Sequence, residues 1–493
     1  MKAYIEGIQY LQSNADLSAY GVYPLSVNFD GGNATFMADD GGEDVIVRVG
    51  DPAGFCGESG TAAGRPYVVA RLDHAAAATL RRLYPFSAPK SVLGERFTFG
   101  VGDRLGVATP GHIRVFKEFG GTPVFAQQSI RELTLTNRTF DDVLDAATFA
   151  VYREGFKSGF GADGDHLKTP DEVRYALKSG YTMVTLDCSA HIRGDVNDMT
   201  DEAVKKEYAL LRDADVEARY LNKAFTVGDD KLTFDETSFM RMYLIYGEAV
   251  TFAESIFKEF FTGDNAPDFE MSIDETATPT TPLQHYFIAS ELIRRGVDVK
   301  TIAPRFCGEF QKGVDYIGDL AQFEKEYVEH TAIADHFGYK ISVHSGSDKF
   351  SVFPIVGRVS NLHVHVKTAG TNWLEAMRVV AEKDPALYRE IHKYALTRFT
   401  DAKKYYHVTT DLSKIPDVDT LSDAALSGLF EENNARQLIH ITYGFILGEK
   451  NADGSFRFKE RLYSLWRKER ETYYVRLYKH IGKHVRLLKS EVK

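Results

Sequence analysis

Two neighbouring segments carry histidines and a lysine at the ends of short apolar runs. The first is YKISVHSGSDKF (339–350) and the second is NLHVHVKTAGTNW (361–373). The alternation of side chains along a strand places His344 on the polar face of the first run, and His365 and Lys367 on one face of the second. Polar residues that face inward near the carboxyl end of a strand, before a glycine-containing loop, are typical of an α/β active site. We therefore expect an active site at these strand ends.

Carboxylates and imidazoles recur at the ends of the other predicted strands. The same alternation selects Asp163, Asp165, Asp187, Glu270, Ser272, Asp274, Arg305 and His440, and His166 lies just beyond Asp165. Each of them alone is compatible with a core histidine or a helix-capping aspartate. Together they favour a functional site, because so many ionisable groups inside one core are costly without a metal ion or mutual partners.

These residue types indicate a transition-metal site. Carboxylate and imidazole ligands without a thiolate cluster suit Zn²⁺, Mn²⁺, Ni²⁺ or Co²⁺ better than Ca²⁺. The predicted ligands are His166, Glu270 and His344, with His365 as an optional fourth. The candidate acids and bases are then Asp165, Asp274 and Lys367. The alternative for the lysine is that it serves only as a counter-ion for the carboxylates.

The loop KTAGTNW predicts a helix start that binds an anion. Thr371 can cap a helix that begins at Asn372, and Gly370 allows the backbone to approach a ligand closely. Backbone N–H groups at a helix N-terminus favour an anion, and barrels often hold one after their last strands. Lys349 and Arg436 are candidate partners for that anion. The alternative is an ordinary helix start without a ligand.

The elements that must position these residues alternate between strand and helix. The predicted strands lie at 123–129, 159–165, 181–187, 268–274 and 299–305, within 339–350, within 361–373, and at 436–444. Helix-start signals follow several of them, at Thr139, Thr169 and Thr281. Eight strands that alternate with helices predict an α/β fold of the (β/α)₈, TIM-like barrel type. The alternative is an open doubly wound sheet, which would need a glycine-rich first turn.

The barrel is expected to be one part of a longer chain. Residues 1–120 combine strand-like segments with Gly-rich turns and predict a β-rich N-terminal region. The barrel is predicted over 121–455, with helical insertions at about 195–262 and 384–435. The tail, 456–493, is basic and helical, and we expect it to pack on the barrel with a solvated Lys/Arg face.

Composition restricts the classes of function. The chain has 493 residues and a formal net charge of −11, which argues against general nucleic-acid binding because that needs a basic surface. There is neither a signal-peptide-like start nor an apolar run long enough to span a bilayer. The three cysteines have no metal-ligand spacing and predict reduced thiols in a cytoplasmic protein. A homo-oligomer is compatible with this composition.

Six ordered blocks carry a resemblance to a known family. They are GFGADGDHLKT, FEMSIDETATPTTP, APRFCGEFQKGVDYIGDL, SVHSGSDKFSVFPIVG, HVHVKTAGTNWLEA and ARQLIHITYG. Together they resemble the tagaturonate epimerase family over roughly residues 120–450. The resemblance implies a metal-dependent isomerase of hexuronate catabolism that interconverts D-tagaturonate and D-fructuronate. Some relatives act on the neutral ketoses tagatose and fructose.

The implied reaction restricts the mechanism. The two uronates differ at the hydroxyl-bearing carbon β to the ketone, whose C–H proton the carbonyl does not acidify, so simple enolisation cannot invert it. Retro-aldol cleavage can invert this carbon if the aldehyde fragment rotates before it adds again. This route would use a metal as Lewis acid and a paired acid and base. Transient oxidation by a nicotinamide is the other route, and no binding fingerprint for it is found. A ketose–aldose isomerase and a non-catalytic sugar-sensing barrel are the rival functions.

Overall fold

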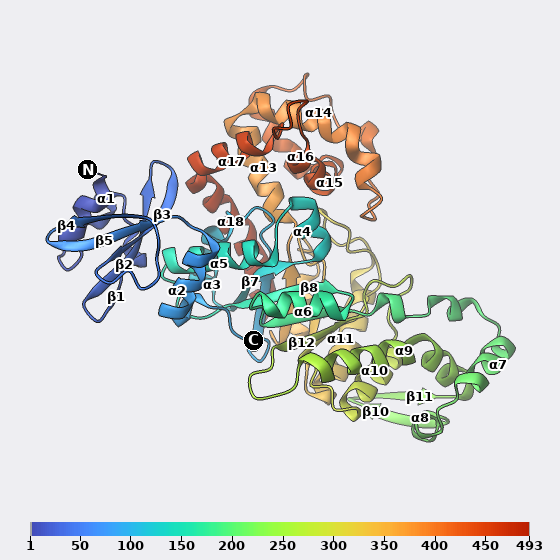
Figure 1. Ribbon diagram of the computed structural model, residues 1–493. Helices are drawn as coiled ribbons and strands as arrows, with labels where there is room; N and C mark the ends of the chain where they lie inside the picture. Colours follow the sequence, from blue (N-terminus) through green and yellow to red (C-terminus); the bar gives the residue numbers. More distant parts are fainter. Residues whose placement is uncertain (1, 493) are drawn as a thin grey trace. The chain divides into compact units, whose positions relative to one another are not determined.

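Eight strands form a closed barrel, and β7, β8 and β12 are labelled among them in Figure 1. The computed structural model describes residues 2–492. In barrel order the strands are β12 (Asp268–Ser272), β13 (Thr301–Ala303), β14 (Lys340–Val343), β15 (Val364–Thr368), β6 (Phe97–Val101), β7 (Thr122–Gln128), β8 (Gly161–Leu167) and β9 (Met183–Asp187). The pairs from β8 through β9, β12, β13 and β14 to β15 are parallel. The predicted (β/α)₈ class is therefore confirmed.

Each barrel strand is followed along the chain by at least one helix. In chain order these helices are α3 (Thr109–Phe119), α4 (Ile130–Thr136), α5 (Phe140–Arg153), α6 (Pro170–Lys178), α9 (Glu236–Phe260), α10 (Pro282–Arg294), α11 (Leu320–Phe337), α12 (Phe353–Ser360) and α13 (Thr371–Lys383). Thr139 and Thr281 form the capping boxes of α5 and α10, and Thr169 caps α6 ahead of Pro170. These caps confirm the predicted helix starts and fix where each loop after a strand ends.

One predicted barrel strand is wrong. The segment 436–444 lies in α15 (Asn433–Ile441) and α16 (Tyr443–Gly448), so His440 sits on a helix. Every residue from Ala435 to Ile441 is buried, and a short apolar segment that is buried on all sides cannot be assigned to strand or helix by its periodicity. The strand that completes the barrel is β6, in the segment that the sequence assigned to the N-terminal region.

The chain divides into two compact units. The first unit comprises the chain up to Lys90, Val101–Ala162 and Gly370–Gly482. The second unit comprises Ser91–Gly100, Asp163–Ala369 and the chain from Lys483 onward. The predicted metal ligands and the candidate acids and bases all belong to the second unit.

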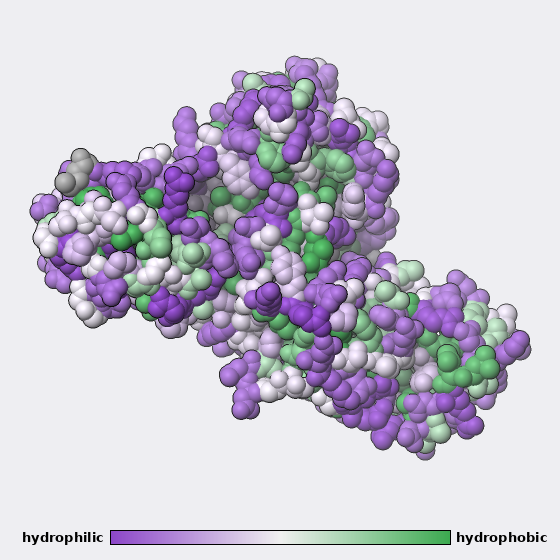
Figure 2. All heavy atoms as spheres, in the orientation of Figure 1, coloured by the Kyte–Doolittle hydropathy of each residue, from purple (hydrophilic) through white to green (hydrophobic). Residues whose placement is uncertain are grey.

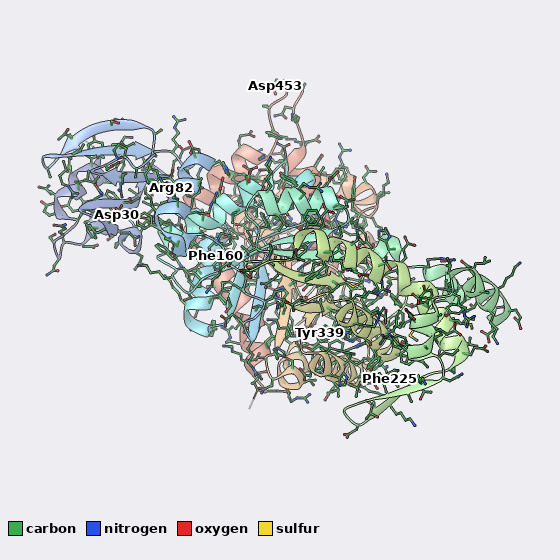
Figure 3. All side chains as sticks on the ribbon, turned by 60° about the horizontal axis from the view of Figure 1, so that its bottom comes forward. Asp30, Arg82, Phe160, Phe225, Tyr339 and Asp453 are labelled. Atoms are coloured by element: carbon green, nitrogen blue, oxygen red, sulfur yellow. The ribbon has the colours of Figure 1, made fainter. Side chains whose placement is uncertain are left out.

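The first unit contains the predicted β-rich N-terminal region. Its antiparallel sheet has the order β1 (Asn28–Asp30), β2 (Asn33–Asp40), β3 (Glu43–Val49), β5 (Arg65–Ala70) and β4 (Glu58–Ala62). The short helix α1 (Ala3–Glu6) precedes the sheet, and α2 (His74–Leu83) follows it. Asp30, labelled in Figure 3, binds the buried Arg48 guanidinium through both of its carboxylate oxygens. This ion pair joins β1 to β3 across the intervening strand β2.

The insertion between β9 and β12 is only partly helical. It contains α7 (Asp201–Leu211), α8 (Ala214–Tyr220) and an antiparallel hairpin of β10 (Lys223–Val227) and β11 (Asp230–Phe234) before α9. Phe225 and Phe234 of the hairpin pack against Tyr286 of α10, which holds the hairpin on the second unit. Figure 2 shows hydrophobic surface over this region, where Leu210 and Leu211 at the end of α7 are exposed.

The remaining segments are mostly helical. They contain α14 (Pro385–Ala402) in the second predicted insertion, and α17 (Lys459–Lys468) and α18 (Arg470–Lys489) in the tail. The last turns of α18 belong to the second unit, where the ring of His484 packs against Phe99 of β6 and Phe353 of α12. Among residues 2–492, no helix is both long enough and apolar enough to cross a bilayer.

Candidate active site

The second unit brings together most of the predicted site residues. Asp163, Asp165 and His166 come from β8, Glu270 from β12, Asp274 from the loop after β12, His344 from the residue after β14, and Lys367 from β15. The register of β8 shifts between Gly164 and Leu167, and His166 has a left-handed backbone with φ of 55°. Such a conformation is uncommon outside glycine and occurs at functional sites where the surrounding structure enforces it.

The ammonium of Lys367 lies among three carboxylates. Its Nζ is 2.7 Å from Asp163 Oδ2, 2.5 Å from Asp165 Oδ1 and 3.3 Å from Glu270 Oε1. It also donates a hydrogen bond of 2.5 Å to the hydroxyl of Thr185. Burial opposes its charge, but the carboxylates raise the pKa of Lys367 above its ordinary value, so the lysine is a charged counter-ion in this structure.

Both oxygens of the Glu270 carboxylate have protein partners. Oε1 accepts hydrogen bonds from Thr185 Oγ1 at 2.9 Å and lies 2.8 Å from His344 Nε2, while Oε2 accepts from the hydroxyl of Thr301. Burial favours the neutral acid, but Lys367 and His344 hold the pKa of Glu270 well below its usual range. Glu270 is therefore an ionised carboxylate that orients its neighbours.

The two imidazoles each use one nitrogen to contact a carboxylate. His166 Nδ1 lies 2.8 Å from Asp165 Oδ1, just as His344 Nε2 contacts Glu270. The other nitrogens face Asp274, whose Oδ1 is 3.2 Å from His344 Nδ1 and 3.8 Å from His166 Nε2. One ligand atom from each of His166, Asp274 and His344 lies within 4.8 Å of the other two. We call these three residues the His–Asp–His cluster.

The His–Asp–His cluster fits a divalent transition-metal ion. Ligand atoms about 2.0–2.2 Å from a shared ion are roughly 3–3.5 Å apart, close to the separations seen here. Two imidazoles with a carboxylate form a suitable ligand set, and a carboxylate behind each ligating histidine is the usual outer partner. The carboxylates of Asp165, Glu270 and Asp274 also raise the pKa of both histidines against the effect of burial. That excess of negative charge is what a cation would offset.

His365 lies deeper in the barrel than this cluster. It pairs in register with Ser342, two residues before His344, and its Nδ1 is 2.8 Å from Thr98 Oγ1. Its Nε2 is buried with no hydrogen-bond partner among the described residues, and burial lowers its pKa to about 3. Strand alternation correctly placed His365 on the inward face, but alternation carries no information about depth along the barrel axis.

The predicted substrate-binding residues are distributed differently. Lys349 donates to the carbonyls of Gln311 at 2.8 Å, Val314 at 2.6 Å and Ser347 at 3.0 Å, so it fastens the loop after β13. The other three predicted residues, Gly370, Thr371 and Arg436, belong to the first unit. Gly370 is the N-cap of α13 and Thr371 its first residue, so the predicted cap by the Thr371 side chain is wrong. Arg436 donates to the carbonyl of Phe430 at 2.6 Å.

Two threonines of the site are not among the residues predicted from the sequence. Thr185 and Thr301 are fully buried on β9 and β13, and their hydroxyls bind the Glu270 carboxylate. Thr185 shares the inward face of its strand with Asp187, so alternation could have found it. β-Branched residues are common in strands for packing reasons, however, and a threonine alone therefore carries no functional signal.

Replacement of Lys367 by methionine should lower the free energy of unfolding by about 3–5 kcal/mol, because it leaves buried carboxylates without their counter-ion. Urea denaturation followed by circular dichroism measures this loss. The matched control is Lys300→Met, which removes an exposed ion pair with Asp298 and should cost less than about 1 kcal/mol. Equal stability of the two variants would show that the buried ammonium does not hold the site together.

Known proteins match this chain over nearly its whole length. The family model described as UxaE, tagaturonate epimerase, matches residues 23–488. The tagaturonate/fructuronate epimerase of Thermotoga maritima is 41% identical over 478 residues, covering 96% of this chain and 97% of the relative.

Solved structures of the fructuronate-tagaturonate epimerase of Cohnella laeviribosi agree with the fold. The native crystal structure superposes with a TM-score of 0.92 at 47% identity, covering 95% of this chain and 96% of the other. A complex with two glycerols gives a TM-score of 0.93 at 46% identity, covering 99% of both chains. A match of this extent shows the family and the enzyme class as well as the fold. The chain belongs to the tagaturonate epimerase family and is an epimerase of the isomerase class.

Proposed function

We propose that this enzyme is a metal-dependent epimerase that interconverts D-tagaturonate and D-fructuronate. The His–Asp–His cluster carries the metal part of the proposal, because its three ligand atoms lie within 4.8 Å of one another and carboxylates hold both imidazoles from behind. The names of the relatives support the substrate pair. The metal is one of Zn²⁺, Mn²⁺, Ni²⁺ or Co²⁺, which accept this nitrogen and oxygen ligand set.

The proposed ligands are His166 Nε2, His344 Nδ1 and an oxygen of Asp274. This assignment replaces Glu270 by Asp274 as the carboxylate ligand, because Glu270 already binds protein donors through both oxygens. Glu270 and Asp165 instead orient the two ligating imidazoles and fix the nitrogen that each presents.

Retro-aldol chemistry accounts for inversion at the carbon β to the ketone. The proton leaves the β-hydroxyl, the bond between the α and β carbons breaks, and the electron pair forms an enediolate from the dihydroxyacetone half. The other fragment is tartronate semialdehyde. Its aldehyde rotates so that the enediolate adds to the opposite face when the bond forms again. A divalent ion at the cluster supplies Lewis-acid polarisation of the substrate oxygens when it is bound.

Asp165 and Lys367 are the proposed acid–base pair. Lys367 Nζ lies 2.5 Å from Asp165 Oδ1, so a proton donor and a proton acceptor stand side by side. The carboxylate of Asp165 can accept the β-hydroxyl proton and return it, and the ammonium of Lys367 can stabilise the resulting oxyanion. The same hydrogen-bonded pair then serves both directions of the reversible reaction.

Removal of either histidine of the cluster should remove the metal. Purified His166→Ala and His344→Ala should each lose most bound metal, and chelation of the native enzyme should abolish activity that the metal ion then restores. Glu270→Gln should keep the metal with about 10–100-fold weaker affinity, because only an outer partner changes. Elemental analysis and circular dichroism give the metal content and the folded state.

The matched control for these variants is His363→Ala, a half-exposed histidine outside the cluster, which should retain the native metal content. Native metal content in a folded His166→Ala, His344→Ala double variant would overturn the proposed ligand set.

Substrate deuterated at the carbon β to the ketone should keep its label through many turnovers. Retro-aldol cleavage breaks a C–C bond at that carbon and leaves its C–H bond intact. Mass spectrometry of both epimers in ordinary water measures the label. Loss of the label at the rate of epimerisation would exclude the proposed route.

Two further outcomes separate the rival functions. Retained label together with a nicotinamide in the purified protein would favour transient oxidation instead. Solvent hydrogen that enters at the α carbon during turnover would indicate a ketose–aldose isomerase. Failure to convert any keto-uronate or ketose after metal is restored would indicate a sugar-sensing barrel.

A further inference from the structure

The first unit contains a second group of buried polar residues, separate in sequence from the metal cluster. Arg104 follows β6, Gln128 ends β7, and Gly370 and Thr371 start α13 after β15. In (β/α)₈ barrels the segments that follow the carboxyl ends of the strands build the active-site face. Several polar atoms of this group are buried with no hydrogen-bond partner among residues 2–492. Buried polar groups nearly always have a hydrogen-bond partner, so we expect each of these atoms to bind one.

Arg104 is a buried cation with one unused side. Its side chain is 3% exposed, with Nε 2.8 Å and Nη2 2.7 Å from Glu132 Oε1, and its guanidinium stacks 3.9 Å above the ring centre of Tyr443. These contacts fix the plane of the guanidinium. Nη1 remains without a hydrogen-bond partner in the described part of the chain. The guanidinium is therefore held rigidly with one donor nitrogen available.

The start of α13 lies against this guanidinium. A side chain on Gly370 would place its Cβ 2.2 Å from His440 Nε2 and 3.3 Å from Arg104 Nη2, so glycine permits the close approach. No side chain of the described residues caps this helix, although Thr371 and Asn372 in its first turn are buried. The first N–H groups of a helix have no partner within the helix, and a buried, uncapped N-terminus therefore needs acceptors from elsewhere.

Gln128 adds an amide to the same group. Phe125 of β7 packs against Phe116 of α3, so alternation directs Gln128 to the opposite face of the strand, toward the barrel interior. Its side chain is 1% exposed, and neither its Oε1 nor its Nε2 has a partner among the described residues. The next residue, Ser129, contacts Glu132, which binds Arg104. The carboxylate of Glu132 thus links the residue after Gln128 to the guanidinium of Arg104.

We propose that Arg104, Gln128 and the first turn of α13 form a subsite for the carboxylate group of a sugar acid. A fixed guanidinium, an amide N–H and the positive end of a helix all favour an anion, and a carboxylate can accept from several donors at once. This inference rests on the proposed uronate substrate. It assigns the anion recognition that was expected of Lys349 and Arg436 to Arg104 and Gln128.

The test compares two neighbouring glutamines on opposite faces of β7. Gln128→Leu removes an amide that has no protein partner, so the melting temperature should not fall. Gln127→Leu is the matched control, since Gln127 is equally buried on the same strand. Calorimetry measures the binding of D-gluconate, an unreactive sugar acid, and of D-glucitol, its neutral counterpart, to the metal-loaded enzyme. Loss of a charge-assisted contact corresponds to an affinity about 10- to 150-fold weaker.

D-gluconate should bind the native enzyme and Gln127→Leu more tightly than D-glucitol does. Gln128→Leu and Arg104→Lys should weaken D-gluconate binding by about 10- to 150-fold and leave D-glucitol binding unchanged. Equal binding of the acid and the polyol by the native enzyme, or native affinity for D-gluconate in both variants, would overturn the subsite. A native enzyme that shows the predicted selectivity but converts no keto-uronate would refute the proposed function and leave the subsite standing.

Discussion

The buried ammonium of Lys367 is the interaction on which the rest of the candidate site depends. Carboxylates packed this closely in a protein interior would otherwise take up protons, because burial and mutual repulsion both disfavour their charge. Lys367 keeps Asp165 and Glu270 ionised, and burial still raises the pKa of the neighbouring Asp163 to about 6. The two histidines of the cluster contact these ionised carboxylates, His166 contacting Asp165 and His344 contacting Glu270.

Those carboxylates decide which imidazole nitrogens are available. When His166 donates its Nδ1–H to Asp165, the lone pair of its Nε2 faces Asp274. When His344 donates its Nε2–H to Glu270, the lone pair of its Nδ1 faces the same carboxylate. Two imidazoles from different parts of the barrel therefore present opposite ring nitrogens, Nε2 of His166 and Nδ1 of His344, to one carboxylate. The backbone at His166 contributes too, since its left-handed conformation lies within the register shift in β8.

The sequence predicted the barrel and the convergence of its polar residues because both follow from local rules. Alternation along strands and helix caps such as Thr139 and Thr281 depend only on neighbouring residues. Prediction from the sequence failed where the type of element or the role of a side chain depends on residues distant in the sequence. The segment around His440 is buried on all sides, so its apolar pattern could not distinguish a helix from a strand. The proposal of Asp274 in place of Glu270 as the ligand depends on the contacts of Glu270 with Thr185 and Thr301, which carry no functional signal by themselves.

We propose that Lys367 and its carboxylates prepare two imidazoles and Asp274 to hold one divalent ion. Crystals of the native enzyme, measured above and below the absorption edge of the metal found by elemental analysis, locate that ion directly. We expect one anomalous peak bonded to His166 Nε2, His344 Nδ1 and Asp274, with Glu270 outside the coordination shell and still bonded to Thr185 and Thr301. An active enzyme whose ion is coordinated by Glu270 and His365, or whose cluster holds no ion at all, would contradict it.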